Sequence, residues 1–250
     1  DAPPSVKVVF PGRDTGVNPI EEVRVKVEAE DDYGLAGVNL HYSVNGAPEK
    51  VVNLLPRAGV KKAEGKTTLA LEDFSLSPGD VVSYYATARD ARTVVKSDIF
   101  FVSAQPFDLR FSQAQASGGG GAGEEDPQFS ERQKEIIGAT WNEIKNPKPE
   151  TAAAEARFLS DMQAKLSDQS HSLAERIRAR NIDDSSPEFK IFTEYMDKAS
   201  ASMKTATAHL RPGRWNDAMP HEQKALQALL RAEAAFRDIR VAFGAQGGGS

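Results

Sequence analysis

Three aspartates are the best candidates for ligand chemistry in this sequence. Asp31 and Asp32 lie in the acidic segment Glu30-Asp31-Asp32-Tyr33-Gly34, which is predicted to join two strands, and Asp90 ends another predicted strand. The sequence predicts that these two loops meet at one end of a β-sandwich. Calcium takes about six to eight hard oxygen ligands, so it is the candidate cofactor. The competing interpretation is that Asp31 and Asp32 form Asx-turns and that Asp90 caps a hairpin.

The histidines do not predict a metal site. No two of them share a short metal-ligand spacing, and the chain has no cysteine to assist them. A zinc site needs about four such ligands, so we expect solvated histidines instead. The four residues are His41, His171, His209 and His221.

No catalytic motif is present in the chain. The sequence lacks a G-x-S-x-G elbow, a Walker loop and an H-E-x-x-H helix. Acidic residues such as Glu131, Glu135 and Asp161 alternate with Lys and Arg, which indicates solvated helix faces rather than acid and base pairs. We therefore predict that the chain is not an enzyme and has no cofactor other than the calcium candidate.

The elements that would position these residues change type across one glycine-rich segment, Ser117–Gly121. Apolar residues alternate with period two before it and recur at spacings of three and four after it. We therefore predict an all-β domain at residues 1–106, a Gly/Ser/acid-rich linker at 107–127, a helical bundle at 128–245 and a Gly-rich tail at 246–250.

The N-terminal half predicts an immunoglobulin-like or fibronectin-like β-sandwich. Val23, Val25 and Val27 alternate with charged residues, as in a half-buried antiparallel strand. Asn45-Gly46 predicts a type I′ hairpin turn, and Pro78-Gly79 predicts a second turn. Seven short strands in about 100 residues favour the sandwich. The strands are expected near 6–10, 23–30, 38–44, 51–55, 66–71, 81–90 and 97–104.

The C-terminal half predicts three or four antiparallel helices. Ser130 and Gln133 suggest a capping box. Asn146-Pro147 ends the first helix, Ser186 and Pro187 start the third, and Pro212-Gly213 ends it. The apolar stripes either cover one another within the chain or leave a face for another subunit. They consist of Leu159, Met162, Leu166, Gln169 and Leu173; of Phe189, Phe192, Met196, Ala199, Met203, Ala206 and Leu210; and of Ala225, Leu229, Ala232, Phe236, Ile239 and Phe243.

Composition narrows the class of partner. The formal net charge is −5, which does not predict nucleic-acid binding. No apolar run approaches the roughly 20 residues that span a bilayer, and no signal peptide is recognisable. The first and last residues suggest a piece of a longer chain.

Several strings resemble one family of uncharacterised bacterial cell-envelope proteins, common in Acidobacteria-like lineages. They are Glu28–Leu35, Tyr42–Gly46, Pro78–Ala86, Arg132–Trp141 and Ala225–Arg237. The resemblance implies N-terminal membrane helices in a longer parent chain, immunoglobulin-like repeats, a helical region and glycine-rich tracts. It implies a periplasmic or cell-surface location, and it offers no catalytic or binding residues to carry over to this chain.

These patterns predict a non-enzymatic structural or protein-interaction module of a bacterial cell envelope. Its partners would be proteins, in a homo-oligomer or a larger envelope assembly, with sheet edges and uncovered helix stripes as contact surfaces. Membrane attachment would come only through other parts of the parent chain. The alternative is a calcium-dependent or glycan-binding module that uses the loops around Asp31, Asp32 and Asp90.

Overall fold

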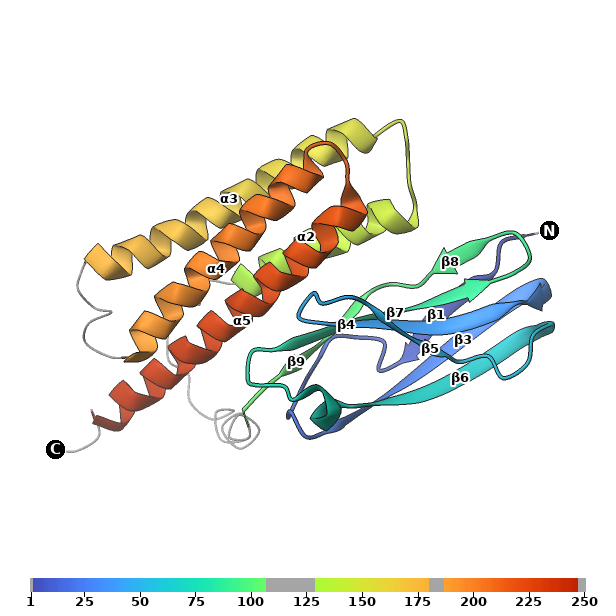
Figure 1. The fold of residues 1–250 in the computed structure, drawn as a ribbon, viewed down its shortest axis with the longest axis horizontal. Coiled ribbons are helices and arrows are strands. Elements are labelled where there is room, and N and C mark those ends of the chain that lie inside the picture. The colour runs from blue at the N-terminus through green and yellow to red at the C-terminus, as the bar shows by residue number, and fades with distance from the viewer. Residues whose placement is uncertain (1, 107–128, 180–186, 247–250) are drawn as a thin grey trace, which may run out of the picture. The chain divides into compact units, whose positions relative to one another are not determined.

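The computed structural model describes residues 2–106, 129–179 and 187–246, the last eight of these by their backbone alone. The chain divides into two compact units, Asp1–Pro106 and Phe107–Ser250. The described part of the first unit consists of strands and one short 3-10 helix, and that of the second consists of helices (Figure 1). The all-β plus all-α division predicted from hydrophobic period is therefore confirmed.

The first unit contains two sheets that share one hydrophobic core. One sheet has the order β1-β3-β6, and the other has the order β2-β9-β7-β4-β5, with β8 paired to the end of β7. Val25, Val27, Leu40 and Tyr84 come from both sheets and are almost fully buried in that core. The elements are β1 (Ser5–Phe10), β2 (Thr15–Val17), β3 (Glu22–Leu35), β4 (Gly37–Val44), β5 (Lys50–Asn53), β6 (Val60–Ala70), η1 (Leu71–Phe74), β7 (Val81–Arg89), β8 (Val94–Lys96) and β9 (Phe100–Ala104).

The period-two pattern fixes the orientation of β3. Val23, Val25, Val27 and Ala29 are buried, and the charged residues between them are more exposed. A one-residue slip would turn every one of these side chains to the other face, so burial specifies the register. β3 pairs with β6 along most of its length, and the two strands run side by side in Figure 1.

The edge strands of the two sheets differ in their protection. β6 carries Lys61, Lys62 and Lys66 along the edge of the three-stranded sheet. Lysine on an edge strand discourages pairing with another sheet. β5, at the edge of the other sheet, has only four residues, and its Val51 side chain is exposed.

Both predicted turns are confirmed. Asn45 and Gly46 have φ values of 53° and 70°, as a type I′ turn requires, and the Ala47 N–H donates to the Val44 carbonyl. The Asn45 side chain also bonds to Asp80 and to the Val81 N–H. Gly79 has a φ of 89°, which suits the third position of a turn that contains Pro78.

The acidic segment at Asp31 is not a connecting loop, which corrects the sequence-based expectation. Residues 30–34 belong to β3, where its pairing with β6 is irregular between Glu30 and Leu35. Within this irregular stretch Asp31 accepts bonds from the Tyr33 and Gly34 N–H groups, and only Ala36 separates β3 from β4. Asp90, in contrast, follows β7 directly, as predicted.

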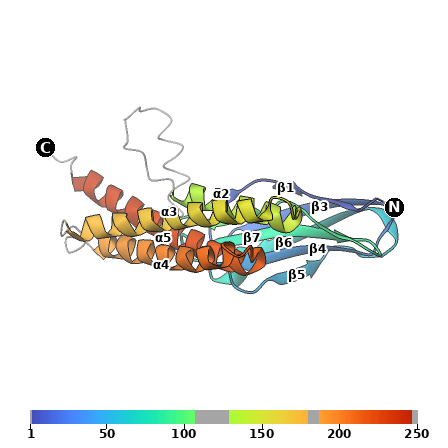
Figure 2. The same cartoon turned by 90° about the horizontal axis from the view of Figure 1, so that it is seen from above.

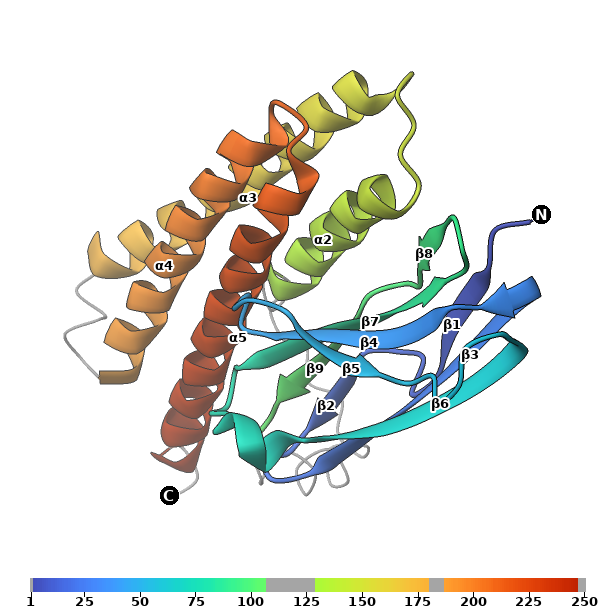
Figure 3. The ribbon, with the colours of Figure 1, turned by 45° about the vertical axis from the view of Figure 1, so that its right-hand side comes forward.

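The described part of the second unit contains four helices. They are α2 (Phe129–Lys145), α3 (Ala152–Ala179), α4 (Pro187–Leu210) and α5 (Trp215–Gln246). α2 packs against α3 and α5, and α4 packs against the same two helices. Figures 2 and 3 show α3, α4 and α5 as long neighbouring rods, with α2 as the shortest helix.

The stripe predicted for α4 is confirmed. Phe192, Met196, Ala199, Met203 and Leu210 are all buried in the bundle. The stripe predicted for α3 is correct only in part. Leu159 and Leu166 are buried, but Met162 is 42% exposed, and the polar Gln163 takes the neighbouring core position with no exposure.

The capping box predicted at Ser130 and Gln133 is wrong. α2 begins at Phe129, and the Ser130 N–H and hydroxyl both donate to Glu233 of α5, at 3.2 and 2.9 Å. A carboxylate near a helix N-terminus satisfies free N–H groups there and interacts favourably with the helix dipole. Gln133 instead pairs with Gln163 across the bundle.

Three sequence-based predictions fall at least partly outside the described residues. These are the linker at 107–127, the helix cap at Ser186 and the tail at 246–250, of which only Gln246 is described, as the last residue of α5. α4 begins at Pro187, as predicted. α5 begins at Trp215 and contains Pro220.

Two glycine substitutions test the packing of the two units separately. A Cβ at Gly65 would lie 2.6 Å from Leu54 Cβ, so we expect Gly65→Ala to destabilise the β unit by about 1–3 kcal/mol. Gly138 is at an exposed position of α2, and a Cβ there would have no atom within 4 Å. Gly138→Ala should therefore stabilise the helical unit by about 0.5–1 kcal/mol. Both tryptophans, Trp141 and Trp215, lie in helices.

Two measurements on the whole chain check these expectations. They are urea unfolding monitored by tryptophan fluorescence, and thermal unfolding monitored by calorimetry. The fluorescence midpoint should rise for Gly138→Ala, and the calorimetric melting temperature of the β unit should fall for Gly65→Ala. A melting temperature that Gly65→Ala leaves unchanged would contradict the close approach of this residue to Leu54.

Candidate functional site

The structure gives two of the predicted calcium ligands a local role. Asp31 accepts hydrogen bonds from the Tyr33 and Gly34 N–H groups, at 3.0 and 2.5 Å. Asp90 accepts from the Arg92 and Thr93 N–H groups, at 2.6 and 2.5 Å. The Thr93 and Arg92 N–H groups hold the pKa of Asp90 below its usual range. These are the Asx-turn and hairpin-cap arrangements of the competing interpretation.

The three aspartates do not form a cluster of metal-ligand side chains in the described part of the chain. Asp32 accepts only a long bond, 3.4 Å, from the Ala2 N–H. In the described ranges 2–106, 129–179 and 187–246, no three His, Asp or Glu side chains lie close enough together to hold a metal ion. Calcium binding at Asp31, Asp32 and Asp90 therefore stays a prediction from sequence.

His41, His209 and His221 are partly buried, which corrects the expectation of solvated side chains for these three, whereas His171 is exposed as predicted. The His41 ring stacks on Tyr85 at 4.8 Å and contacts Thr87 Oγ1 at 3.1 Å. His171 contacts Asp197 at 3.1 Å on the bundle surface. His209 and His221 stack on each other at 5.3 Å, with the Nδ1 atom of His209 buried.

A polar cluster around His41 lies on the six-stranded sheet and its β4–β5 turn. The Tyr85 hydroxyl donates to Glu49 at 2.9 Å, and His41 Nδ1 lies 3.6 Å from the same carboxylate. His41 and then Tyr85 hold the pKa of Glu49 below its usual range, against the opposing effect of burial. Both hydroxyl groups of the described cluster are engaged, that of Thr87 with His41 and that of Tyr85 with Glu49.

Pairs of polar side chains connect the helices inside the bundle. The Gln133 and Gln163 amides donate to each other, at 3.1 and 2.8 Å, and both side chains have no exposure. The Ser167 hydroxyl contacts the Ser200 hydroxyl at 2.9 Å and donates to its carbonyl at 3.0 Å. Each pair joins two helices, so each fixes the register between them.

Glu222 carries an unusual buried carboxyl group. The Thr140 hydroxyl donates to its Oε1 atom at 2.8 Å, and its Oε2 atom has no hydrogen-bond partner among the described residues. Burial raises the pKa of Glu222 to about 8, against the opposing effect of the Thr140 hydrogen bond. The group is therefore largely protonated at neutral pH, and it lines none of the three cavities described below.

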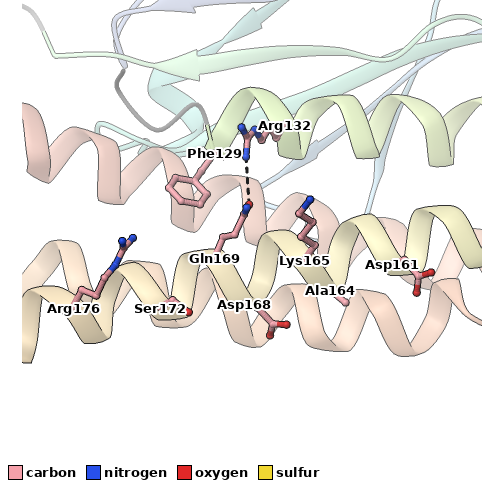
Figure 4. A pocket seen from close by; sticks show the side chains of 9 residues that line it. All are labelled: Phe129, Arg132, Asp161, Ala164, Lys165, Asp168, Gln169, Ser172 and Arg176. Carbon is pink, nitrogen blue, oxygen red and sulfur yellow. Dashed lines mark hydrogen bonds between the residues drawn. The ribbon is translucent and has the colours of Figure 1, made fainter. Parts of the chain in front are cut away.

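A long groove runs between α2 and α3. One part, of about 780 Å³, is lined by residues that include Phe129, Arg132, Lys165, Gln169 and Arg176 (Figure 4). A second part, of about 410 Å³, shares Arg132, Lys165 and Gln169, so the two parts adjoin at these residues. We call this combined surface the α2–α3 groove.

The two ends of the α2–α3 groove differ in chemistry. Ala139, Phe158 and Met162 line one end. Phe129 and Arg176 line the other, and the Arg132 guanidinium donates to Gln169 at 3.3 Å between the ends. Hydrophobic periodicity alone did not predict the groove. One signal was available: Phe158 is a large apolar residue outside the predicted stripe, and its spacing of four residues from Met162 places both on one face of α3.

A third cavity, of about 370 Å³, lies at the N-terminal end of α2. Its lining is mainly apolar and includes Leu173, Phe192 and Phe236. Glu233 is the buried acid there, and burial raises its pKa, while its bonds to Ser130 act in the opposite direction. Because this carboxyl already holds the start of α2, its arrangement has a structural explanation.

The family comparison distinguishes the α2–α3 groove from the predicted calcium ligands. A family model described as a domain of unknown function, DUF4175, matches residues 92–247, more than half of the chain. This chain belongs to the DUF4175 family. The DUF4175 match contains the whole α2–α3 groove and excludes Asp31, Asp32 and Asp90. No curated protein matches the chain.

Similarity to solved structures is low. A carbohydrate-binding module of family 56, described as a β-1,3-glucan binding domain, is 16% identical, with 40% of this chain and 98% of that chain covered and a TM-score of 0.23. A CARDB domain from Pyrococcus furiosus, in complex with di-metal ions, is 17% identical, with 41% and 94% covered and a TM-score of 0.26.

A laminaripentaose-producing β-1,3-glucanase from Paenibacillus barengoltzii is 17% identical, with 40% of this chain covered and a TM-score of 0.23. The match spans only 20% of that enzyme. At such TM-scores these likenesses carry no argument about the ligand or activity of this DUF4175 chain.

The calcium hypothesis has a direct test. Because Asp31 and Asp90 already accept backbone N–H bonds, we expect millimolar Ca²⁺ to leave the melting temperature of the β unit unchanged. Calorimetry of the whole DUF4175 chain with Ca²⁺ or with a chelator measures this. A rise with Ca²⁺ that Asp31→Asn abolishes and Asp73→Asn, a control in η1, retains would establish the calcium site instead.

The Glu222 carboxyl predicts a pH-dependent stability of the bundle. Its folded-state pKa, about 8, exceeds the unfolded value of 4.5, so its contribution is fully present below about pH 4.5 and is lost as pH rises towards 8. Between about pH 5 and pH 8 the unmodified chain should therefore lose on the order of 2–4 kcal/mol relative to Glu222→Gln.

Urea unfolding followed by tryptophan fluorescence measures this difference across pH. Contributions from His221 are common to both proteins and cancel in the comparison. Glu150→Gln, at an exposed position between α2 and α3, is the matched control and should keep the unmodified pH dependence. Parallel curves for the unmodified chain and Glu222→Gln would show that the carboxyl is ionised in the folded state.

Proposed function

We propose that this DUF4175 chain is a non-enzymatic protein-interaction module of a bacterial cell envelope, and that its helical unit carries the main contact surface. The observation that carries the proposal is the α2–α3 groove, which leaves Phe158 59% and Met162 42% exposed on a helix with an otherwise well-packed core. Exposed apolar side chains that gather in a groove are typical of protein-binding surfaces.

The arrangement of titratable groups supports a non-enzymatic function. Catalysis by side chains needs a base within hydrogen-bond reach of a nucleophile, in a cavity that substrate can enter. In the described part of the chain, His171 lies against Asp197, which also pairs with Arg178, and Glu222 lies in the bundle core with Thr140. Neither Glu222 nor His171 lines one of the three cavities described above.

The strand order of the β unit supports an immunoglobulin-like sandwich. In that fold strands A, B and E share one sheet, and strands G, F and C share the other. The orders β1-β3-β6 and β9-β7-β4 correspond to these two sets. We assign this unit a supporting role, because its long β6 edge carries lysines that oppose sheet pairing.

The envelope assignment comes from the sequence resemblance. Among the described residues, no helix is both long and apolar enough to cross a bilayer. The same resemblance assigns membrane attachment to other parts of a parent chain, and we assign protein partners, in a homo-oligomer or a larger envelope assembly, to this part. A net charge of −5 supports protein rather than nucleic-acid partners.

Site-specific photocross-linking in the producing bacterium tests the proposed function. A photoreactive benzoyl-phenylalanine in place of Phe158 should give a discrete protein adduct, because this side chain faces an interaction groove. The same group in place of Ile191, which is 43% exposed on α4, is the matched control and should give little adduct.

Mass spectrometry of the adduct distinguishes a second copy of the chain from another protein. Equal labelling from positions 158 and 191, or no adduct from position 158, would contradict the proposed function.

A further inference from the structure

The exposed face of α3 repeats with heptad spacing. Its residues step by four and three along the helix, all of them line the α2–α3 groove, and none is buried in the core. They are Phe158, Met162, Lys165, Gln169, Ser172 and Arg176. This second stripe lies beside the core stripe of Leu159, Leu166 and Leu173.

Heptad spacing on an uncovered helix face fits another helix. Residues at i, i+3, i+4 and i+7 are the contact positions when an amphipathic helix binds in a groove. The stripe from Phe158 to Arg176 covers about 27 Å of helix at ~1.5 Å per residue. α2 forms one wall of the groove, so an additional helix would contact both α2 and α3.

The cations of the groove are oriented for an acidic ligand. Figure 4 shows Lys165 and Arg176 extending from α3 towards α2, while Asp168 points away. Arg132 comes from α2 and contacts the neutral Gln169. Within the described ranges, none of these three cations forms an ion pair with a carboxylate.

Three acidic residues also line the groove, Asp161 and Asp168 on α3 and Glu135 on α2. Asp161 and Asp168 occupy positions just before Met162 and Gln169, on the flank of the stripe away from its core-facing side. A ligand over the stripe would therefore meet cations along its centre near Lys165 and Arg176, and apolar side chains at the Phe158 end.

We infer that the α2–α3 groove binds one amphipathic helix of a partner protein. Its apolar side chains would cover Phe158 and Met162, and its carboxylates would face Lys165, Arg132 and Arg176. The inference rests on the proposed function and specifies the chemistry of the partner. Burying the two large apolar side chains supplies most of the affinity, and the charge pairs select the partner and its register.

A pair of synthetic helical peptides of about 20 residues tests the inference on the whole chain. Both carry leucines at the seam positions of one half. The other half carries glutamates in the first peptide and lysines in the second. Fluorescence anisotropy should show that the glutamate peptide binds, that its affinity falls with added salt, and that the lysine peptide does not bind.

Substitutions in the groove should change these affinities in different ways. The double variant Phe158→Ala/Met162→Ala should weaken the glutamate peptide about tenfold or more and keep its salt dependence. The double variant Lys165→Glu/Arg176→Glu should lose the glutamate peptide and gain the lysine peptide. Lys204→Glu, at an exposed position of α4, is the matched charge control and should change the affinity for neither peptide.

All substituted residues are exposed, and circular dichroism verifies that each variant is folded. Equal binding of both peptides, binding of neither, or a charge-reversed variant that does not exchange its preference would overturn the inference. Where the peptides fail but cross-linking from position 158 succeeds, the partner chemistry is wrong and the proposed function stands. Where both fail, the proposed function falls as well.

Discussion

The register of α2 against α3 depends on the paired amides of Gln133 and Gln163. Each amide donates to the other, and neither has contact with solvent. A sliding motion of one helix turn would leave four polar atoms buried without partners, each at a cost of about 1–3 kcal/mol. This contact therefore places Arg132 beside Gln169 and Ala139 near Phe158, and so determines the chemistry of both ends of the groove.

The start of α2 depends on a second contact of the same kind. Glu233 of α5 satisfies the Ser130 N–H and hydroxyl, and α2 also meets α5 through Thr140 and Glu222. Three buried polar contacts thus hold the shortest helix of the bundle. Apolar surfaces can slide slightly against each other and stay packed. A shift between two hydrogen-bonded side chains instead breaks the bond and leaves a polar atom without a partner. The walls of the groove are consequently well defined.

Much of the fold could be predicted because its signals are local. The alternation in β3, the positive φ angles at Asn45 and Gly46 and the apolar stripe of α4 each depend on residues close together in the sequence. The errors involve contacts between distant residues. Ser130 suggests a capping box, but its partner, Glu233, is 103 residues away. Gln163 is polar, so hydrophobic periodicity assigned its core position to Met162.

The candidate site was harder to predict than the fold. Asp31, Asp32 and Asp90 have the right chemistry for a metal site, but residue type equally allows the backbone hydrogen bonds that Asp31 and Asp90 make, so it could not decide between the two interpretations. The groove combines Phe158 and Met162 with Arg132, which comes from another helix. Only the three-dimensional packing shows that α2 leaves this side of α3 uncovered.

The lysines of β6 limit how copies of this chain can crowd together. Where many copies are held at high local concentration, an unprotected strand of eleven residues would invite sheets to merge irreversibly. Lys61, Lys62 and Lys66 place charged side chains along that border, with Lys62 paired to Glu30 and Lys66 to Glu64, so close neighbours can remain folded and separate. Assembly through helices would form and dissociate without exchange of strands at this border.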